Sequence, residues 1–183
     1  MVRVRWIVLM CVGVVLVVSA CSGKPSTEGE TTTTLSSGTT ADSSNPGATE
    51  HDPCELLSVD EIDAATGVSF GDAEFNETLS SEVAQICDWI GQEDGIATVQ
   101  VLVGTFGVSG FDDTRSATEE AMGAVQDASV PGAARAFATT DGSIVGMDLD
   151  GQYVQVAYIP SEPGNVLPAT LDMAGHVADR YLR

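Results

Sequence analysis

Hydrophobic and polar positions divide the chain into three stretches with different patterns. Residues 6–18 form an uninterrupted apolar run, residues 22–52 are almost entirely polar, and from residue 53 onward apolar positions recur with the periods of helices and strands. Only the third stretch has a pattern that can build a hydrophobic core. At about 130 residues it has the size of one ordinary domain. We therefore predict a single folded domain over residues 53–183.

Three segments of this domain have the apolar spacing of amphipathic helices. The first, 59–66, begins with a capping box formed by Ser58 and Glu61 and ends at a glycine. The second, 112–128, carries a narrow stripe of small residues. The third starts at Pro168 and runs toward the C-terminus. Each helix is expected to pack one face against a sheet.

Five other segments have the pattern of strands. Residues 84–90 and 96–106 are joined by a short loop with glycine at both ends, which predicts a hairpin. The segments 133–139, 143–148 and 152–159 are separated by two Asp-Gly pairs, which are strong signals for hairpin turns. The predicted order is helix, two strands, helix, three strands, helix. This order indicates an α+β fold, with a mostly antiparallel sheet of about five strands and helices packed on one face.

The apolar run at the N-terminus has the three parts of an export signal. Arg3 and Arg5 precede it, residues 6–18 carry no charge, and small residues follow directly. A helix of this length covers about 20 Å of a hydrocarbon core about 30 Å thick, which disfavours a retained transmembrane helix. We predict a signal peptide over residues 1–20. A secretory signal that is cleaved without lipidation is a second alternative.

The sequence Val18-Ser19-Ala20-Cys21 resembles the lipobox of bacterial lipoproteins. The resemblance implies cleavage before Cys21, a diacylglyceryl group on its sulfur, palmitate as an attached acyl chain, and a position on the extracytoplasmic face of the cell membrane. Two acyl chains anchor a protein stably, whereas one binds only marginally. The Ser- and Thr-rich remainder of segment 21–52 cannot bury enough apolar surface to fold. It is predicted to be a disordered tether with an average span of about 30 Å.

Cys54 and Cys87 are the only cysteines in the predicted domain. In an exported chain such a pair is interpreted first as a disulfide. A metal site is less favoured because no second thiol pair or histidine cluster accompanies them. A redox role is less favoured still, because there is no Cys-x-x-Cys. Trp89 follows Cys87 by two residues on the same strand face and is expected to pack against the disulfide.

Charge limits the classes of partner. Without the signal peptide the chain keeps 5 basic and 27 acidic residues, a net charge of −22. Such a charge repels nucleic acids, anionic lipid headgroups and anionic wall polymers, so we expect no nucleic-acid binding. It is compatible with a cationic partner.

No motif predicts a catalytic residue, a cofactor or a metal. Residues 67–71 read Gly-x-Ser-x-Gly, but a hydrolase elbow needs a strand before the serine and a helix after it. Here a helix precedes Ser69, and an acidic segment, 71–82, follows as a predicted surface loop; His176 is the domain's single histidine. Residues 148–151 are interpreted as a hairpin turn rather than a calcium loop. The candidates for contacts with a ligand are the aromatic residues Trp89, Tyr153 and Tyr181.

Several segments together resemble a known family. They are the lipobox, the tether, the opening Asp52-Pro53-Cys54-Glu55-Leu56-Leu57, the capped helix and Cys87-Asp88-Trp89. In combination they are similar to an actinobacterial lipoprotein family whose domain has no known function. The resemblance implies the disulfide and supplies no catalytic residues. We expect a membrane-anchored module, attached through Cys21, that binds a small ligand or an envelope protein. The alternatives are an accessory envelope protein and, least favoured, a hydrolase.

Overall fold

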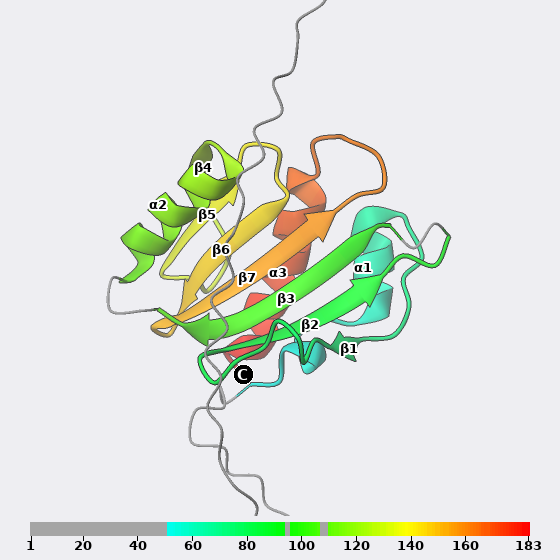
Figure 1. The fold of residues 1–183 in the computed structure, drawn as a ribbon, viewed down its shortest axis with the longest axis horizontal. Helices are drawn as coiled ribbons and strands as arrows, with labels where there is room; N and C mark the ends of the chain where they lie inside the picture. Colours follow the sequence, from blue (N-terminus) through cyan, green and yellow to red (C-terminus); the bar gives the residue numbers. More distant parts are fainter. Residues whose placement is uncertain (1–50, 94–95, 107–109) are drawn as a thin grey trace, which may run out of the picture. The chain divides into compact units, whose positions relative to one another are not determined.

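The computed structural model describes residues 51–93, 96–106 and 110–183. Within them, seven strands form one sheet in the order β1-β2-β3-β7-β6-β5-β4, and every pairing is antiparallel (Figure 1). The predicted signal peptide, Cys21 and nearly all of the predicted tether lie outside the described residues. The strands are β1 (Glu74–Phe75), β2 (Ala84–Ile90), β3 (Thr98–Thr105), β4 (Val125–Ala128), β5 (Arg135–Thr139), β6 (Ile144–Leu149) and β7 (Gln152–Ile159). The helical elements are a 3₁₀ turn, η1 (Pro53–Glu55), and the helices α1 (Val59–Thr66), α2 (Gly110–Met122) and α3 (Leu167–Tyr181).

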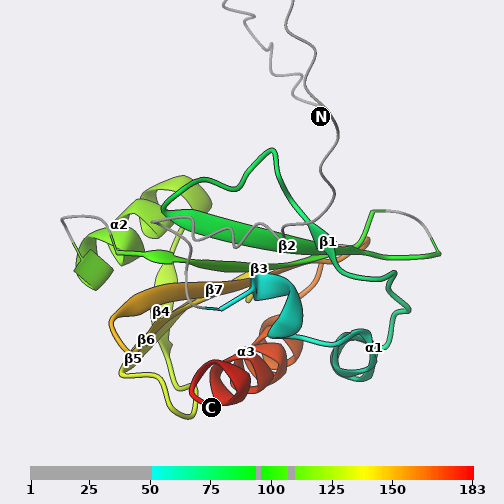
Figure 2. The ribbon, with the colours of Figure 1, turned by 90° about the horizontal axis from the view of Figure 1, so that it is seen from below.

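Helices cover both faces of the sheet. Figure 2 shows α1 and α3 on one side of the sheet and α2 on the other. The prediction that the helices pack on one face is therefore wrong. The reason lies in Phe111, the single buried residue of α2, which packs on Phe137 and Tyr153 of the second face. No helix in the described part of the chain is both long and apolar enough to cross a membrane.

The main core lies between the sheet and the pair α1 and α3. Alternation along β3 sends Val99, Val101 and Val103 into this core and the intervening residues to the second face. The helix α3 meets them with buried side chains spaced three and four apart. A disulfide with an S–S distance of 2.08 Å joins Cys54 to Cys87, which confirms the predicted pairing. Trp89 belongs to the same core cluster as Cys87.

The sheet has seven strands rather than five, because two strands formed where the sequence predicted something else. The strand β1 lies within the predicted loop 71–82 and is only two residues long, too short to show alternation. The strand β4 lies within the predicted helix 112–128. The helix ends instead at Met122, before Gly123 with its positive φ of 92°, and the next residues pair with β5.

Other boundaries follow their local signals closely. The helix α1 spans the predicted residues 59–66, with the capping box of Ser58 and Glu61 formed and Gly67 ending it in the left-handed conformation. The strand β7 also has its predicted bounds. Asp150 and Gly151 form the two-residue turn before β7, both with positive φ, as a type I′ hairpin requires.

Candidate functional site

The three aromatic residues predicted to contact a ligand are all buried. Trp89 is 1% exposed and belongs with Tyr181 to the main core, whereas Tyr153 lies in a second cluster on the opposite face. The structure therefore does not bring the three together, and none presents its ring at the surface. Burial raises the pKa of Tyr153 well above its usual value, and its hydroxyl donates to Gln155 Oε1 at 2.8 Å. A ligand-contact role for these residues stays a prediction.

An aromatic cluster fixes α2 to one half of the second face. The ring of Phe111 on α2 lies 5.5 Å from that of Phe137 and 5.9 Å from that of Phe106. Tyr153 completes the cluster at 5.6 Å from Phe106. Arg135 of β5 stacks 4.3 Å above the Phe111 ring. Because these contacts lie over β5, β6 and part of β7, α2 covers one half of this face and not the other.

The other half of the second face carries exposed aliphatic side chains. In the cross-strand register, Ile90 of β2, Thr98 of β3 and Ile159 of β7 form one row, and Asp88 and Gln100 belong to the next. We call these five residues the open sheet face. Ile90 is 41% exposed and Ile159 is 58% exposed. Large apolar side chains so exposed on a sheet are the kind of surface that marks interaction sites.

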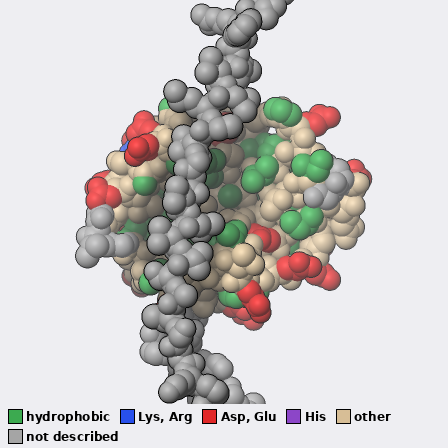
Figure 3. Space-filling view, in the orientation of Figure 1, with side chains coloured by type: hydrophobic (Ala, Val, Ile, Leu, Met, Phe, Trp, Pro, Cys, Tyr) green, Lys and Arg blue, Asp and Glu red, His purple; other side chains and the backbone are tan. Residues whose placement is uncertain are grey.

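Exposed apolar residues are concentrated near this face. Figure 3 shows hydrophobic side chains gathered over it and carboxylates around its rim, with basic side chains visible only in a small area at the left. Of the eight large hydrophobic residues that are exposed in the described part, only Met122 and Leu182 lie elsewhere. The other six belong to β1, β2, β7 or the loops beside β2: Phe75, Leu79, Val83, Ile90, Ile96 and Ile159.

A pocket of about 360 Å³ lies at the edge of the open sheet face. Asp88 accepts hydrogen bonds from Asn76 Nδ2 at 2.5 Å and from Gln100 Nε2 at 2.8 Å, so both carboxylate oxygens are held in place. Glu74 of β1 lies directly opposite Asp88, on the same face of the sheet. We call this pocket of about 360 Å³ the acidic pocket. Its lining residues are Glu74, Phe75, Asn76, Glu77, Thr78, Asp88 and Ile90.

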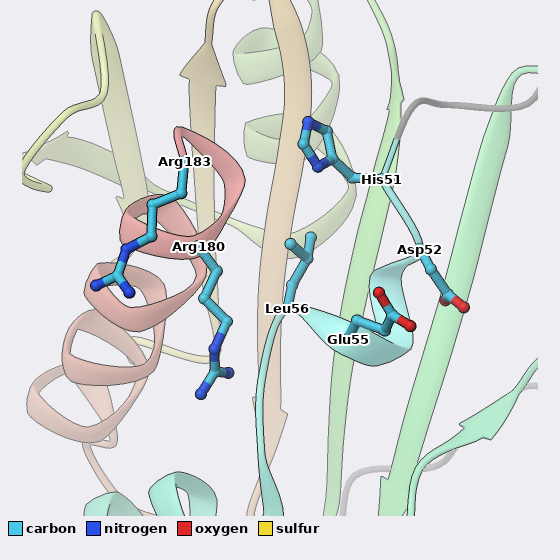
Figure 4. A pocket seen from close by; sticks show the side chains of 6 residues that line it. All are labelled: His51, Asp52, Glu55, Leu56, Arg180 and Arg183. Atoms are coloured by element: carbon cyan, nitrogen blue, oxygen red, sulfur yellow. The ribbon is translucent and has the colours of Figure 1, made fainter.

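A second pocket, of about 280 Å³, lies where the first residues of the domain meet the end of α3 (Figure 4). Its arginines already have partners. Arg180 binds Glu61 at 2.8 Å, Arg183 binds Asp179, and the His51 ring packs at a tilt against Tyr181. Figure 4 shows that the charged ends of the side chains do not converge on one point. We interpret this pocket as a structural junction. It is lined by His51, Asp52, Glu55, Leu56, Arg180 and Arg183.

Glu61 links α1 to α3. It accepts hydrogen bonds from the Ser58 backbone N–H and hydroxyl, pairs with Arg180, and lies 3.3 Å from His176 Nδ1. Burial raises the pKa of Glu61, but the hydrogen bonds from Ser58 and the charge of Arg180 outweigh burial and hold the pKa below its usual value. The sequence predicted the capping box but not the contacts to α3, which join residues 119 positions apart.

Replacing Glu61 by glutamine is expected to lower the free energy of unfolding at neutral pH by about 1 kcal/mol. Since folding lowers the pKa of Glu61, its charge stabilises the fold above the unfolded-state pKa, and this contribution is lost as pH falls through the folded-state pKa. The difference between wild type and E61Q should therefore shrink in acid. Urea denaturation at neutral and acidic pH measures it. E120Q, on the exposed side of α2, is the control, and a difference that persists in acid contradicts the expectation.

The Gly-x-Ser-x-Gly segment does not have the surroundings of a nucleophile elbow. It follows α1, Ser69 accepts a backbone hydrogen bond from Gln92, and Phe70 forms an isolated bridge with Gly91. The next helix, α2, starts only at Gly110. In the described ranges, no three His, Cys, Asp or Glu side chains are grouped as a metal site requires. Residues 148–151 form the β6–β7 turn, with Gly151 N donating to Asp148 Oδ1 at 3.1 Å.

The contacts that form the acidic pocket were missed by reasoning from sequence. Asp88 belongs to the segment Cys87-Asp88-Trp89, in which only the cysteine and the tryptophan were assigned a predicted role. Strand alternation places Asp88 and Ile90 on the face opposite Trp89, and that signal could have identified them. Glu74 and Asn76 come from the segment predicted as a surface loop, where no local pattern indicates pairing with β2.

Comparison with known proteins identifies a family but no function. No curated protein and no solved structure matches the chain. A family model described as "Protein of unknown function (DUF3558)" matches residues 16–173. The match covers most of the chain and includes Cys21, both cysteines of the disulfide and all seven strands. The chain therefore belongs to this family of proteins of unknown function, DUF3558.

Proposed function

We propose that this protein is a lipid-anchored binding module of the cell envelope, which binds its ligand through the open sheet face. One observation carries the proposal: Ile90 and Ile159 are exposed on a sheet whose other aliphatic residues are largely buried. Leaving aliphatic surface in water costs free energy, about 25 cal/mol per Å², and a binding partner recovers it. A surface of this kind supports a role in binding rather than in catalysis.

The anchor rests on the N-terminal residues. The short apolar run, the small residues at positions 19 and 20, and Cys21 directly after them have the order of a lipoprotein signal. The family match begins at residue 16 and so includes this junction. Acylated Cys21 would hold the protein on the extracytoplasmic face of the membrane, and a tether of about 30 Å would let the domain reach partners.

The open sheet face is a better candidate than the pocket beside α3. In that pocket the arginines are paired with Glu61 and Asp179, so an incoming ligand would have to break existing ion pairs. On the open sheet face the aliphatic side chains face solvent and no contact has to be broken. The face also lies next to the acidic pocket, because Asp88 and Ile90 belong to both.

A photo-crosslinking amino acid at Ile159 is expected to give a defined adduct in intact cells. The same amino acid at Asp172, which is exposed on α3, should give none, because α3 lies on the opposite side of the sheet. Before crosslinking, fractionation should place the protein in the membrane fraction. C21A should leave that fraction or keep an uncleaved signal, whereas C11A should behave as wild type. Equal adducts from both positions, or from Asp172 alone, would refute the proposed surface.

A further inference from the structure

We infer that the open sheet face binds a basic and apolar polypeptide segment, one of whose Arg or Lys side chains enters the acidic pocket. The inference rests on the proposed function and adds the chemistry of the partner. It is carried by the charge around the face, by the fixed carboxylate of Asp88, and by the aliphatic residues beside it.

The segment that supplies β1, β2 and β3 has acidic residues and no basic ones. The sequence contains no Lys or Arg between Lys24 and Arg115, a range that includes α1, β1, β2 and β3. Clusters of one sign of charge create a potential that attracts partners of the opposite sign. The partner that complements this face is therefore cationic.

The carboxylates of the acidic pocket are not neutralised within the described part of the chain. Its ion pairs do not include Glu74, Glu77 or Asp88. The donors to Asp88 are the neutral amides of Asn76 and Gln100, which orient the carboxylate but leave its charge. Glu74 and Asp88 lie directly opposite each other on neighbouring strands. Like charges in this arrangement destabilise a sheet. A guanidinium or ammonium group placed between them removes that repulsion.

The apolar residues around the carboxylates disfavour a purely ionic ligand. Phe75 and Ile90 line the acidic pocket itself, and Ile159 lies in the same cross-strand row as Ile90. A simple cation or a polyamine would satisfy the charge and leave these side chains in water. An extended polypeptide segment with a basic and an aliphatic residue two positions apart presents both on one side, and so covers the acidic and the apolar row of the face together.

A second copy of this chain is disfavoured as the occupant. Pairing two open sheet faces would bring Glu74 and Asp88 of one copy close to the same residues of the other. The segment that supplies β1, β2 and β3 has no basic residue, so the same strands of the second copy offer no cation to offset the repulsion.

The test uses the full-length mature protein in detergent and a soluble peptide that repeats Arg-Ser-Leu-Ser, about eight residues long to match the strands, so that Arg and Leu lie on one side of an extended chain. Isothermal titration should detect binding that weakens with added salt. D88N should weaken binding about 10-fold or more. D172N, which removes the same charge from the exposed side of α3, should change it less than about 2-fold. I159S, at an exposed position, should weaken binding about 5-fold without affecting folding.

Four outcomes would overturn the inference. The first is an equal loss of binding in D88N and D172N. The second and third are unchanged affinity when Glu replaces Arg in the peptide, or when Gly replaces Leu. The fourth is a concentration-dependent dimer in sedimentation that D88N strengthens. Circular dichroism of D88N checks its fold, and I159S gives an independent readout if D88N is unstable. If crosslinking at Ile159 succeeds while D88N binds normally, the proposed function stands and the cationic partner does not. If crosslinking at Ile159 fails, the proposed function itself fails.

Discussion

Replacing Cys54 and Cys87 together by alanine lowers the free energy of unfolding by about 3 to 4 kcal/mol. The disulfide joins residues 33 positions apart, and in the chain-entropy model opening a loop of this size gives the unfolded chain that much additional freedom. The bond ties η1 to β2, and Cys87 is fully buried, so its loss also removes packing from the core. Urea denaturation of wild type and variant measures the change.

A reducing agent provides the matched control for this expectation. Reduced wild type should approach the stability of the double variant, whereas the double variant should not respond to the reductant. A loss below about 1 kcal/mol in the variant would show that the unfolded chain is already restricted without the bond. Such a result would contradict the entropic account.

Gly142→Ala is the second large expected effect, with a loss of about 3 kcal/mol. Gly142 lies in the β5–β6 turn with φ of 78°, where an L-residue is strained. A Cβ built on it would also overlap the backbone N and Cα of Leu167 at the start of α3. Backbone atoms cannot move aside as a flexible side chain can, so either the turn or the helix must shift.

Gly151→Ala separates the two contributions. Gly151 has nearly the same φ, 81°, and also lies in an Asp-Gly turn, but a Cβ there would have nothing within 4 Å. Its replacement should cost about 1 kcal/mol, the strain of the left-handed conformation alone. Thermal and urea unfolding of both variants give the comparison. Equal losses would mean that α3 moves away from the turn at little cost.

Local signals predicted the elements whose boundaries they control. Ser58 and Glu61 are three residues apart, and together they mark the start of α1. The alternation over residues 152–159 defines β7 without information on the strands that pair with it. The strand β4 could not be found this way, because Val125 and Ala128 also fit the small-residue stripe of a helix. Pairing with β5 decides in favour of a strand, and that contact is not local.

The side of the sheet on which each helix lies is not determined by periodicity. The helix α2 has one buried residue, Phe111, and the contacts of that residue determine the face on which the helix packs. Here the contacts are with Phe137 and Tyr153. The ligand contacts predicted for the large aromatic residues stay a prediction, and the structure shows that Trp89 and Tyr181 pack in the core. The exposed residues that remain are smaller and less conspicuous in the sequence.

The position of the disulfide has a mechanical consequence for an anchored protein. A pull transmitted along the chain from its N-terminal side reaches the folded residues just before Cys54. That cysteine is covalently joined to β2, inside the sheet, so the load passes directly to a strand held by hydrogen bonds on both sides. The helix α1 follows Cys54 and therefore lies outside the path of the force. Under tension from its N-terminal side the load therefore enters the domain at β2 and not at α1.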